Sequence, residues 1–217
     1  MADLPESAEL PVAGTAVILR DAGAGPEVLL MRRPDRGSFA SAWVFPGGRV
    51  EEADRRPGAT EAEDAARAAV RETAEEVGLG IVDPVPLSCW SPPAEVRPRI
   101  RTWFFLARDP GGALVLSEGE VVEAAWMSPA AALAAHAEGR LTLVPPTWVT
   151  LHGLTAAKDV AAVVAAAGEP EVRQTRLRRT DVGLVHFWEG DEEHEHGAPG
   201  GRHRLIAEGL PWRFERS

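Results

Sequence analysis

The sequence is poor in cysteine and in long apolar runs. Its single cysteine, Cys89, excludes an internal disulfide and fits a reducing compartment. Because Cys89 lies in a segment typical of a strand, we expect a buried structural thiol. Residues Met1–Leu10 lack the basic-then-apolar pattern of a signal peptide, and no apolar run approaches the ~18 residues that span a bilayer. We therefore expect a cytoplasmic protein without a membrane segment.

The sequence also has fewer basic than acidic residues. The chain has 23 lysines and arginines against 33 aspartates and glutamates, which gives a net charge of -10. Such a surface repels phosphate backbones, and there is no long basic run, so nucleic-acid binding is not expected. A small anionic substrate remains compatible, because bound cations neutralise it locally. With 217 residues and 45% apolar content, the chain suits one domain with a modest appendage.

Strand and helix patterns alternate along the chain. Strand patterns occupy residues 11–20, 27–33, 81–90, 99–108 and 120–127. Ser128 and Pro129 predict the start of a short helix ending near Gly139, and another helix is expected over residues 146–167. The C-terminal part is β-rich, with strands expected over 173–178, 184–188, 202–207 and 212–215. We expect one domain over residues 1–170, with a β-rich extension, residues 171–217, packed on it.

A third helix is expected directly after the polar stretch 49–59, which reads as a loop. Thr60 and Glu63 form a potential capping box at its start, and Gly78 is well placed as its C-terminal stop. The residues between them are strong helix formers. Apolar or small residues recur at spacings of three and four and predict one buried stripe, made of Ala66, Ala69, Val70, Thr73 and Val77.

Three carboxylates share one side of this helix. At ~100° per residue, Glu72, Glu75 and Glu76 lie within one turn of each other. Like charges at these spacings repel and destabilise a helix, so a bound cation is the simplest reason for the cluster. Hard oxygen ligands suit Mg²⁺ or Mn²⁺. The alternative is a solvated face on which Arg71 pairs with Glu75.

Together with the preceding glycines, this segment resembles the signature of the Nudix hydrolase family. That signature is a glycine, a glutamate at the head of a helix, and then REUxEExGU, where U is a bulky aliphatic residue. The matching positions are Gly48, Glu63, Arg71, Glu72, Glu75, Glu76, Gly78 and Leu79. There are two departures: the stretch from Gly48 to Arg71 contains an insertion, which falls in the polar loop, and Thr73 replaces an aliphatic residue.

The resemblance implies an α/β/α sandwich with a mixed sheet and a catalytic loop-helix-loop. It implies Mg²⁺- or Mn²⁺-dependent hydrolysis of a diphosphate bond in a small nucleoside-diphosphate-linked metabolite. The implied metal ligands are the Gly47 carbonyl and the carboxylates of Glu72, Glu75, Glu76 and Glu120.

Roles beyond metal binding also follow from the resemblance. Glu72, Glu76 and Glu120 are expected to act in catalysis, and Arg71 to orient a glutamate through a charge-assisted hydrogen bond. Glu118 is the alternative to Glu120. Apart from the resemblance, Arg32, Arg33 and Arg36 lie near the glycine pair, and these arginines, with Gly48, are expected to contact substrate phosphates. The alternative for the arginines is a solvated basic loop.

A particular branch is suggested by the segments VLLMRRPDRGSFASAWVFPGGRVEEAD and LVPPTWVTLHGL, which resemble the peroxisomal coenzyme A diphosphatases and their bacterial relatives. The resemblance implies coenzyme A or acyl-coenzyme A as substrate. ADP-ribose, NADH and nucleotide sugars are the alternatives, as is a non-catalytic Nudix-fold sensor. Such sensors typically lose signature glutamates, and all four are present here. Homodimers are common in the family, and the extension is a candidate interface.

Overall fold

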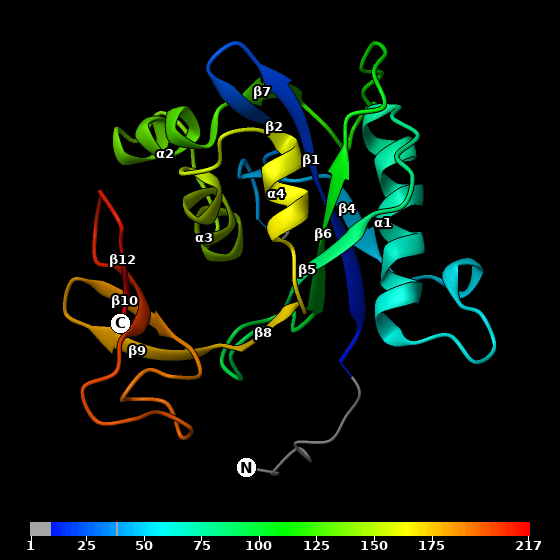
Figure 1. Ribbon diagram of the computed structural model, residues 1–217. Helices are drawn as coiled ribbons and strands as arrows, with labels where there is room; N and C mark the ends of the chain where they lie inside the picture. Colours follow the sequence, from blue (N-terminus) through cyan, green and yellow to red (C-terminus); the bar gives the residue numbers. More distant parts are fainter. Residues whose placement is uncertain (1–9, 38) are drawn as a thin grey trace.

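A large mixed sheet forms the centre of the molecule. The structure, a computed structural model, describes residues 10–37 and 39–217. Eight strands make the main sheet, in the order β3-β2-β1-β6-β5-β8, with β4 also paired to β1 and β7 to β2 (Figure 1). They are β1 Val12–Ala22, β2 Gly25–Arg32, β3 Trp43–Val44, β4 Gly47–Arg49, β5 Val85–Ser91, β6 Arg101–Arg108, β7 Glu123–Met127 and β8 Glu171–Gln174.

The middle of the sheet is a parallel pair, β1 and β6, and the other parallel pair is β5 and β8. Residues 16–19 of β1 and 104–107 of β6 are buried almost without interruption. A continuous apolar run of this kind indicates a strand covered on both faces. The sheet therefore divides the core into two apolar clusters, one on each side.

Helix α1, Glu61–Val77, covers one face. Thr60 and Glu63 form the expected capping box, and Gly78 ends the helix in the left-handed conformation with φ 76°. The predicted buried stripe was partly wrong. Ala65 and Ala68 are fully buried, whereas Ala66 and Val70 are only partly covered. The fully buried residues of the helix are Ala65, Ala68, Ala69, Thr73 and Val77.

The reason is the close approach of α1 to β1. A Cβ on Gly14 would lie 1.8 Å from the carbonyl oxygen of Ala65, so the two backbones touch. Such an approach needs the smallest side chains of the helix against the strand. The face with Ala65 and Ala68 therefore turns inward, and the larger Val70 moves to its border.

Three helices cover the opposite face: α2 Pro129–Ala137, α3 Pro145–Leu154 and α4 Val160–Ala166. The helix expected over residues 146–167 is two helices. The break occurs because Asp159 caps a new start, its Oδ1 accepting the N–H of Ala162 at 2.7 Å. With α1 on one side and α2–α4 on the other, the predicted α/β/α sandwich with a mixed sheet is confirmed (Figure 1).

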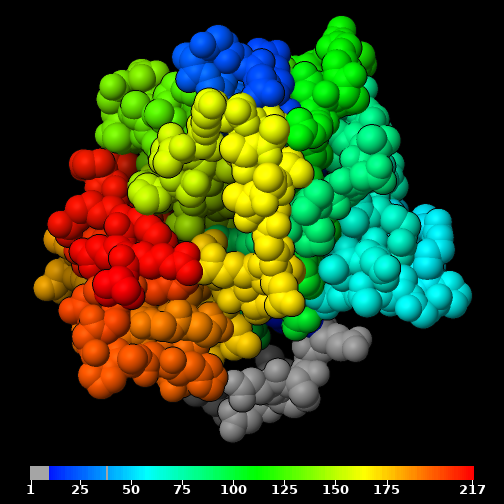
Figure 2. Space-filling view, in the orientation of Figure 1, coloured from blue at the N-terminus to red at the C-terminus, as the bar shows by residue number. Residues whose placement is uncertain are grey.

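The C-terminal extension has two parts. Its first strand, β8, joins the main sheet beside β5, so the single strand expected over residues 173–178 is two strands. The remaining strands form a separate antiparallel sheet of order β12-β11-β10-β9, with β9 Arg176–Thr180, β10 Gly183–Phe187, β11 His203–Ala207 and β12 Arg213–Arg216. Figure 2 shows this orange-to-red lobe beside the green and yellow helices.

Two smaller expectations concern single features. Cys89 is 3% exposed, and burial raises the pKa of its thiol to about 12, as expected for a structural cysteine. The polar stretch 49–59 contains a short 3-10 helix, η1 Glu52–Asp54. In the described part of the chain, every helix is too short or too polar to traverse a lipid bilayer.

Candidate active site

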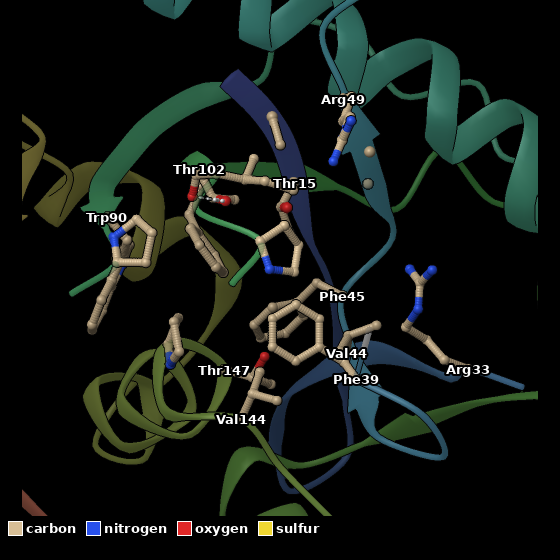
Figure 3. Close-up of a pocket in the computed structure, with 18 of the residues that line it drawn as sticks. Thr15, Arg33, Phe39, Val44, Phe45, Arg49, Trp90, Thr102, Val144 and Thr147 are labelled. Atoms are coloured by element: carbon tan, nitrogen blue, oxygen red, sulfur yellow. Dashed lines mark hydrogen bonds between the residues drawn. The ribbon is translucent and has the colours of Figure 1, made fainter. Parts of the chain in front are cut away.

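A cleft of about 920 Å³ lies between α1 and the C-terminal lobe and is lined by residues of β1, β5 and β6. Figure 3 shows Arg33 and Arg49 on one side of it, Trp90 on the other, and Thr15 and Phe45 between them. Its charged lining residues are Arg33, Arg36, Arg49, Glu72, Glu76 and Glu120. The glycine pair of β4, Gly47 and Gly48, also lines it. Six sequence-predicted site residues besides Gly48 therefore meet here: Arg33, Arg36, Gly47, Glu72, Glu76 and Glu120.

The glycine pair fits closely against the glutamates of α1. Gly47 donates its N–H to Oε2 of Glu76 at 2.8 Å. A Cβ on Gly48 would lie 2.2 Å from Oε1 of Glu72, well inside any allowed contact. Gly47 itself has φ 153° and no room for a Cβ beside the Gly14 carbonyl oxygen. Gly47 is thus required by shape, because its Cβ would meet backbone, and its N–H fixes Glu76 at the cleft wall. Gly48 leaves open the space that the Glu72 carboxylate occupies.

Both carboxylates are partly withdrawn from water. Burial and then the neighbouring Glu72 raise the pKa of Glu76 to about 7, against the lowering effect of the Gly47 N–H. Burial also raises the pKa of Glu72, although Arg71 opposes the change. A raised pKa means that too little positive charge lies near each carboxylate to stabilise its ionised form. The site is therefore suited to a cation.

Arg71 lies behind the carboxylates and does not line the cleft. Its guanidinium donates to Oδ1 and Oδ2 of Asp54 at 3.1 and 2.9 Å, to Glu72 at 3.0 Å, to Glu75 at 2.9 Å and to the Arg49 carbonyl at 2.9 Å. It joins the inserted loop to α1. Arg71 thereby restrains Glu72 directly.

Two signature glutamates lie away from the cleft wall. The Glu75 side chain is 54% exposed and is held by Arg71. Glu63 caps the start of α1 through Thr60 and is likewise exposed. The acid that contacts Arg71 from outside the helix is Asp54, the last residue of η1 in the polar loop 49–59. The sequence contained a signal for it, an acidic residue a short distance after the glycine pair, but the signature match used Glu63 instead.

The expected phosphate-binding arginines separate in space. Arg33 lines the cleft, and its Nε is buried without a hydrogen-bond partner among the described residues. Arg32 instead pairs with Glu123 at 3.3 Å across β2 and β7 and is not part of the cleft lining. The two side chains alternate because neighbouring strand residues point to opposite faces. Arg36 lines the cleft and donates to the Gly119 carbonyl at 2.7 Å.

Glu120 and Glu118 also differ in position. Glu120 lines the cleft, and its Oε2 accepts the Ser117 hydroxyl at 2.8 Å. Glu118 is exposed and outside the lining. Glu120 lies in a turn before β7 rather than in the strand expected from residue 120. Of the two acids, only Glu120 therefore faces Glu76 across the cleft.

The described side chains do not form a complete metal site in the conformations that they adopt. Within residues 10–37 and 39–217, no three His, Cys, Asp or Glu side chains come close enough to enclose an ion. Glu75 is drawn outward by Arg71, and Glu72 and Glu76 repel each other. The donors nonetheless fit Mg²⁺ or Mn²⁺ in kind, because they are hard carboxylate oxygens of which two are partly desolvated.

The C-terminal lobe also reaches the cleft, which the sequence reasoning missed. Thr175, His186 and Trp188 are part of the lining. They follow or lie in short strands whose patterns predicted a β-rich extension but gave no signal of a site. These residues are far from α1 in the sequence, so only the folded structure shows that they line the same cleft.

The fold and the cleft define an α/β/α protein in which a carboxylate-bearing helix faces a glycine-rich strand. The model of the NUDIX domain matches residues 10–145. The chain belongs to the Nudix family.

Solved structures share the fold. A NUDIX hydrolase from Alicyclobacillus acidocaldarius is 23% identical with a TM-score of 0.66, over 75% of this chain and 99% of that one. A MutT NUDIX hydrolase from Burkholderia pseudomallei is 21% identical, TM-score 0.52, over 67% and 98%. The NUDIX domain of NrtR from Shewanella oneidensis, complexed with ADP ribose, is 17% identical, TM-score 0.53, over 67% and 86%. No curated protein matches the chain in sequence.

Proposed function

We propose that the protein hydrolyses a diphosphate bond in a nucleoside-diphosphate-linked metabolite with the help of Mg²⁺ or Mn²⁺. The observation that carries the proposal is the fit of Glu72 and Glu76 against Gly48 and Gly47 at the wall of the cleft. It is supported by family membership and by the Nε of Arg33 in the same cleft, which is buried and has no hydrogen-bond partner in the part of the chain that the structure describes.

In this proposal Glu72, Glu75, Glu76 and Glu120 and the Gly47 carbonyl hold the metal. Bound there, Mg²⁺ or Mn²⁺ screens phosphate oxygens and lowers the pKa of a bound water. Glu75 has to turn from Arg71 toward the cleft, and Glu120 has to approach from its turn. Each movement is a side-chain rotation of an exposed residue, so neither disturbs the core.

The remaining steps belong to the chain's own residues. Arg33 and the Gly48 backbone bind the diphosphate, and Arg33, with Arg36 and Arg49, supplies positive charge beside the glutamates of the cleft. Arg71 keeps Glu72 in place. A carboxylate of the cluster accepts the proton of the attacking water. Placement of anion, water and leaving group in one cleft removes much of the entropy barrier.

For the substrate we propose coenzyme A or an acyl derivative, with ADP-ribose, NADH and nucleotide sugars as alternatives. A cleft of about 920 Å³ has room for a ligand far larger than the diphosphate. The test is a panel of these compounds incubated with the full chain in Mg²⁺, in Mn²⁺ and in EDTA, with products separated by chromatography. Cleavage of one or more compounds in metal and none in EDTA is expected. Tight binding without cleavage in any metal would make the protein a sensor instead.

A further inference from the structure

The cleft has a second end, lined by the C-terminal lobe. Thr175 precedes β9, His186 lies in β10 and Trp188 follows it, and all three line the cleft together with Trp90 of β5 and Thr147 of α3. Figure 3 places Trp90 on the other side of the hollow from Arg33 and Arg49, with Thr147 near Phe45 between them. This group of five residues is called the distal end below.

The distal end carries no formal charge. All the charged side chains of the described lining come from α1, from β4, from the loop after β2 and from the turn before β7, and none from the distal end. Its neighbours in the lining are mainly apolar: Phe45, Pro92, Pro93, Pro98, Phe104 and Pro145. The charged end of the cleft suits a diphosphate, and the distal end suits an uncharged group.

The tryptophans form a fixed aromatic wall. Their ring centroids are 5.4 Å apart with an interplanar angle of 86°, an edge-to-face pair. Trp188 donates its Nε1–H to Oγ1 of Thr175 at 3.0 Å, and Trp90 donates its own to Ser88 at 2.9 Å. Both indole donors are satisfied, so neither ring leaves a polar atom for a ligand. Trp90 and Trp188 are 3% and 0% exposed, and the Arg173 guanidinium lies over their rings, 4.5 Å from the Trp90 centroid and 5.8 Å from the Trp188 centroid.

His186 is the polar exception. Among the described residues nothing forms a hydrogen bond or ion pair with its ring, although the side chain is only partly exposed. Burial lowers its pKa to about 4, so the ring is neutral near pH 7. A neutral imidazole has one donor and one acceptor nitrogen, and here both are available to a ligand.

We propose that the distal end binds the uncharged, largely apolar end of the substrate, and that His186 selects this group through a hydrogen bond. The inference rests on the proposed function for the location of the diphosphate. The ligand chemistry is shared by two sources, a nucleobase ring and an acyl or pantetheine arm. His186 is thus a specificity-determining residue contributed by the extension.

The test uses the full chain in four forms: wild type, His186→Leu, His186→Gln and His196→Ala. His196 is an exposed histidine of the same lobe that does not line the cleft, so its variant controls for loss of an imidazole from the extension. Dissociation constants for pyrophosphate, ADP, ADP-ribose, coenzyme A and hexanoyl-coenzyme A are measured by calorimetry in EDTA. KM and kcat are measured separately in Mg²⁺ for any compound that is cleaved.

We expect His186→Leu to weaken the ligands that reach the distal end about tenfold, the effect of one hydrogen bond. His186→Gln and His196→Ala keep wild-type affinity, pyrophosphate binds all four forms alike, and kcat is unchanged. Weakening of ADP identifies the nucleobase as occupant; weakening of the coenzyme A compounds without ADP identifies the arm.

Equal affinities of His186→Leu and wild type for every ligand would overturn the inference. So would weaker binding of pyrophosphate, or an equal loss in His196→Ala, because either points to a general disturbance. Absence of binding by every compound also overturns it. Binding that depends on His186 without cleavage in any metal leaves the inference standing and removes only the proposed hydrolysis.

Discussion

Asp54 accepts two hydrogen bonds from the guanidinium of Arg71, at 3.1 Å from Nε and 2.9 Å from Nη2. The Asp54 side chain is 4% exposed, and its Oδ2 also accepts the Glu51 N–H at 2.9 Å. Burial alone would raise its pKa, but Arg71 and the Glu51 N–H hold it below its usual range. The inserted loop is thereby fastened to the helix that carries the carboxylates.

Replacing Asp54 by alanine should therefore affect both stability and catalysis. Removing Asp54 deletes two hydrogen bonds of Arg71, which keeps its bonds to Glu72, Glu75 and the Arg49 carbonyl, and we expect a cost of about 2 kcal/mol in the free energy of unfolding. Arg71 then restrains Glu72 less firmly, and we expect kcat to fall about tenfold with KM nearly unchanged. Urea unfolding and steady-state kinetics measure the two effects.

Glu52→Ala is the matched control, since Glu52 belongs to the same short helix but is exposed and makes no side-chain contact with Arg71. It should match wild type in both measurements. An Asp54→Ala protein with unchanged kcat would show that the insertion serves stability alone.

Gly48→Ala should disable the site while the fold persists. The new Cβ would meet Oε1 of Glu72 at 2.2 Å, so the carboxylate has to leave its position. We expect a loss of turnover of about a hundredfold or more, as for other displaced catalytic groups. Gly80→Ala is the control, because nothing lies within 4 Å of a Cβ there. Circular dichroism should show native helix content for both, and turnover of Gly48→Ala equal to that of Gly80→Ala would contradict the packing argument.

Replacing single glutamates of α1 by glutamine should lower turnover to different degrees. Glu76→Gln removes the charge of a buried side chain that contacts Gly47 and lines the cleft, and we expect turnover to fall by orders of magnitude with little change in unfolding temperature. Glu75→Gln removes an exposed charge, and we expect a smaller loss. Near-wild-type turnover of Glu76→Gln would refute its assignment as a ligand. Metal titration of each variant supplies a separate check of affinity.

Local interactions made much of α1 predictable. Its start at Thr60, its end at Gly78 and the shared side of Glu72 and Glu76 depend on hydrogen bonds or periodicity within a few residues. The direction of its buried stripe was not predictable, because an alanine-rich helix offers little contrast between faces. The contact of Ala65 with Gly14 decides it, and that contact is tertiary.

The missed parts of the site are all non-local. Asp54 and Arg71 are 17 residues apart, and His186 belongs to a different sheet from Gly47. Neither pair shares a periodic pattern that a sequence could reveal. The cytoplasmic location, the homodimer and the ligand set, Glu75 included, stay predictions.

The C-terminal lobe depends on a buried ion pair, and this makes its stability sensitive to acid. Asp191 is fully buried; its carboxylate accepts the Arg204 Nε–H at 2.6 Å and the N–H groups of Glu193 and His203 at 3.0 Å. Burial opposes ionisation, but these donors, Arg204 first, lower the pKa to about 2, from 3.8 for a free carboxyl. Because the folded pKa lies below the unfolded one, the pair's stabilisation is complete above about pH 4 and is lost as pH falls toward 2.

The pH dependence can be isolated with Asp191→Asn, which cannot titrate. At pH 7 the wild type should be the more stable protein, and its advantage in the free energy of unfolding should shrink by about 2 kcal/mol between pH 5 and pH 2. Urea unfolding followed by tryptophan fluorescence measures it, since Trp188 lies in the lobe. Asp181→Asn lies at an exposed turn of the same lobe, and its difference from wild type in the free energy of unfolding should not shrink as the pH falls. A difference between wild type and Asp191→Asn that stays constant with pH would mean that the Arg204 pair contributes by shape and not by charge.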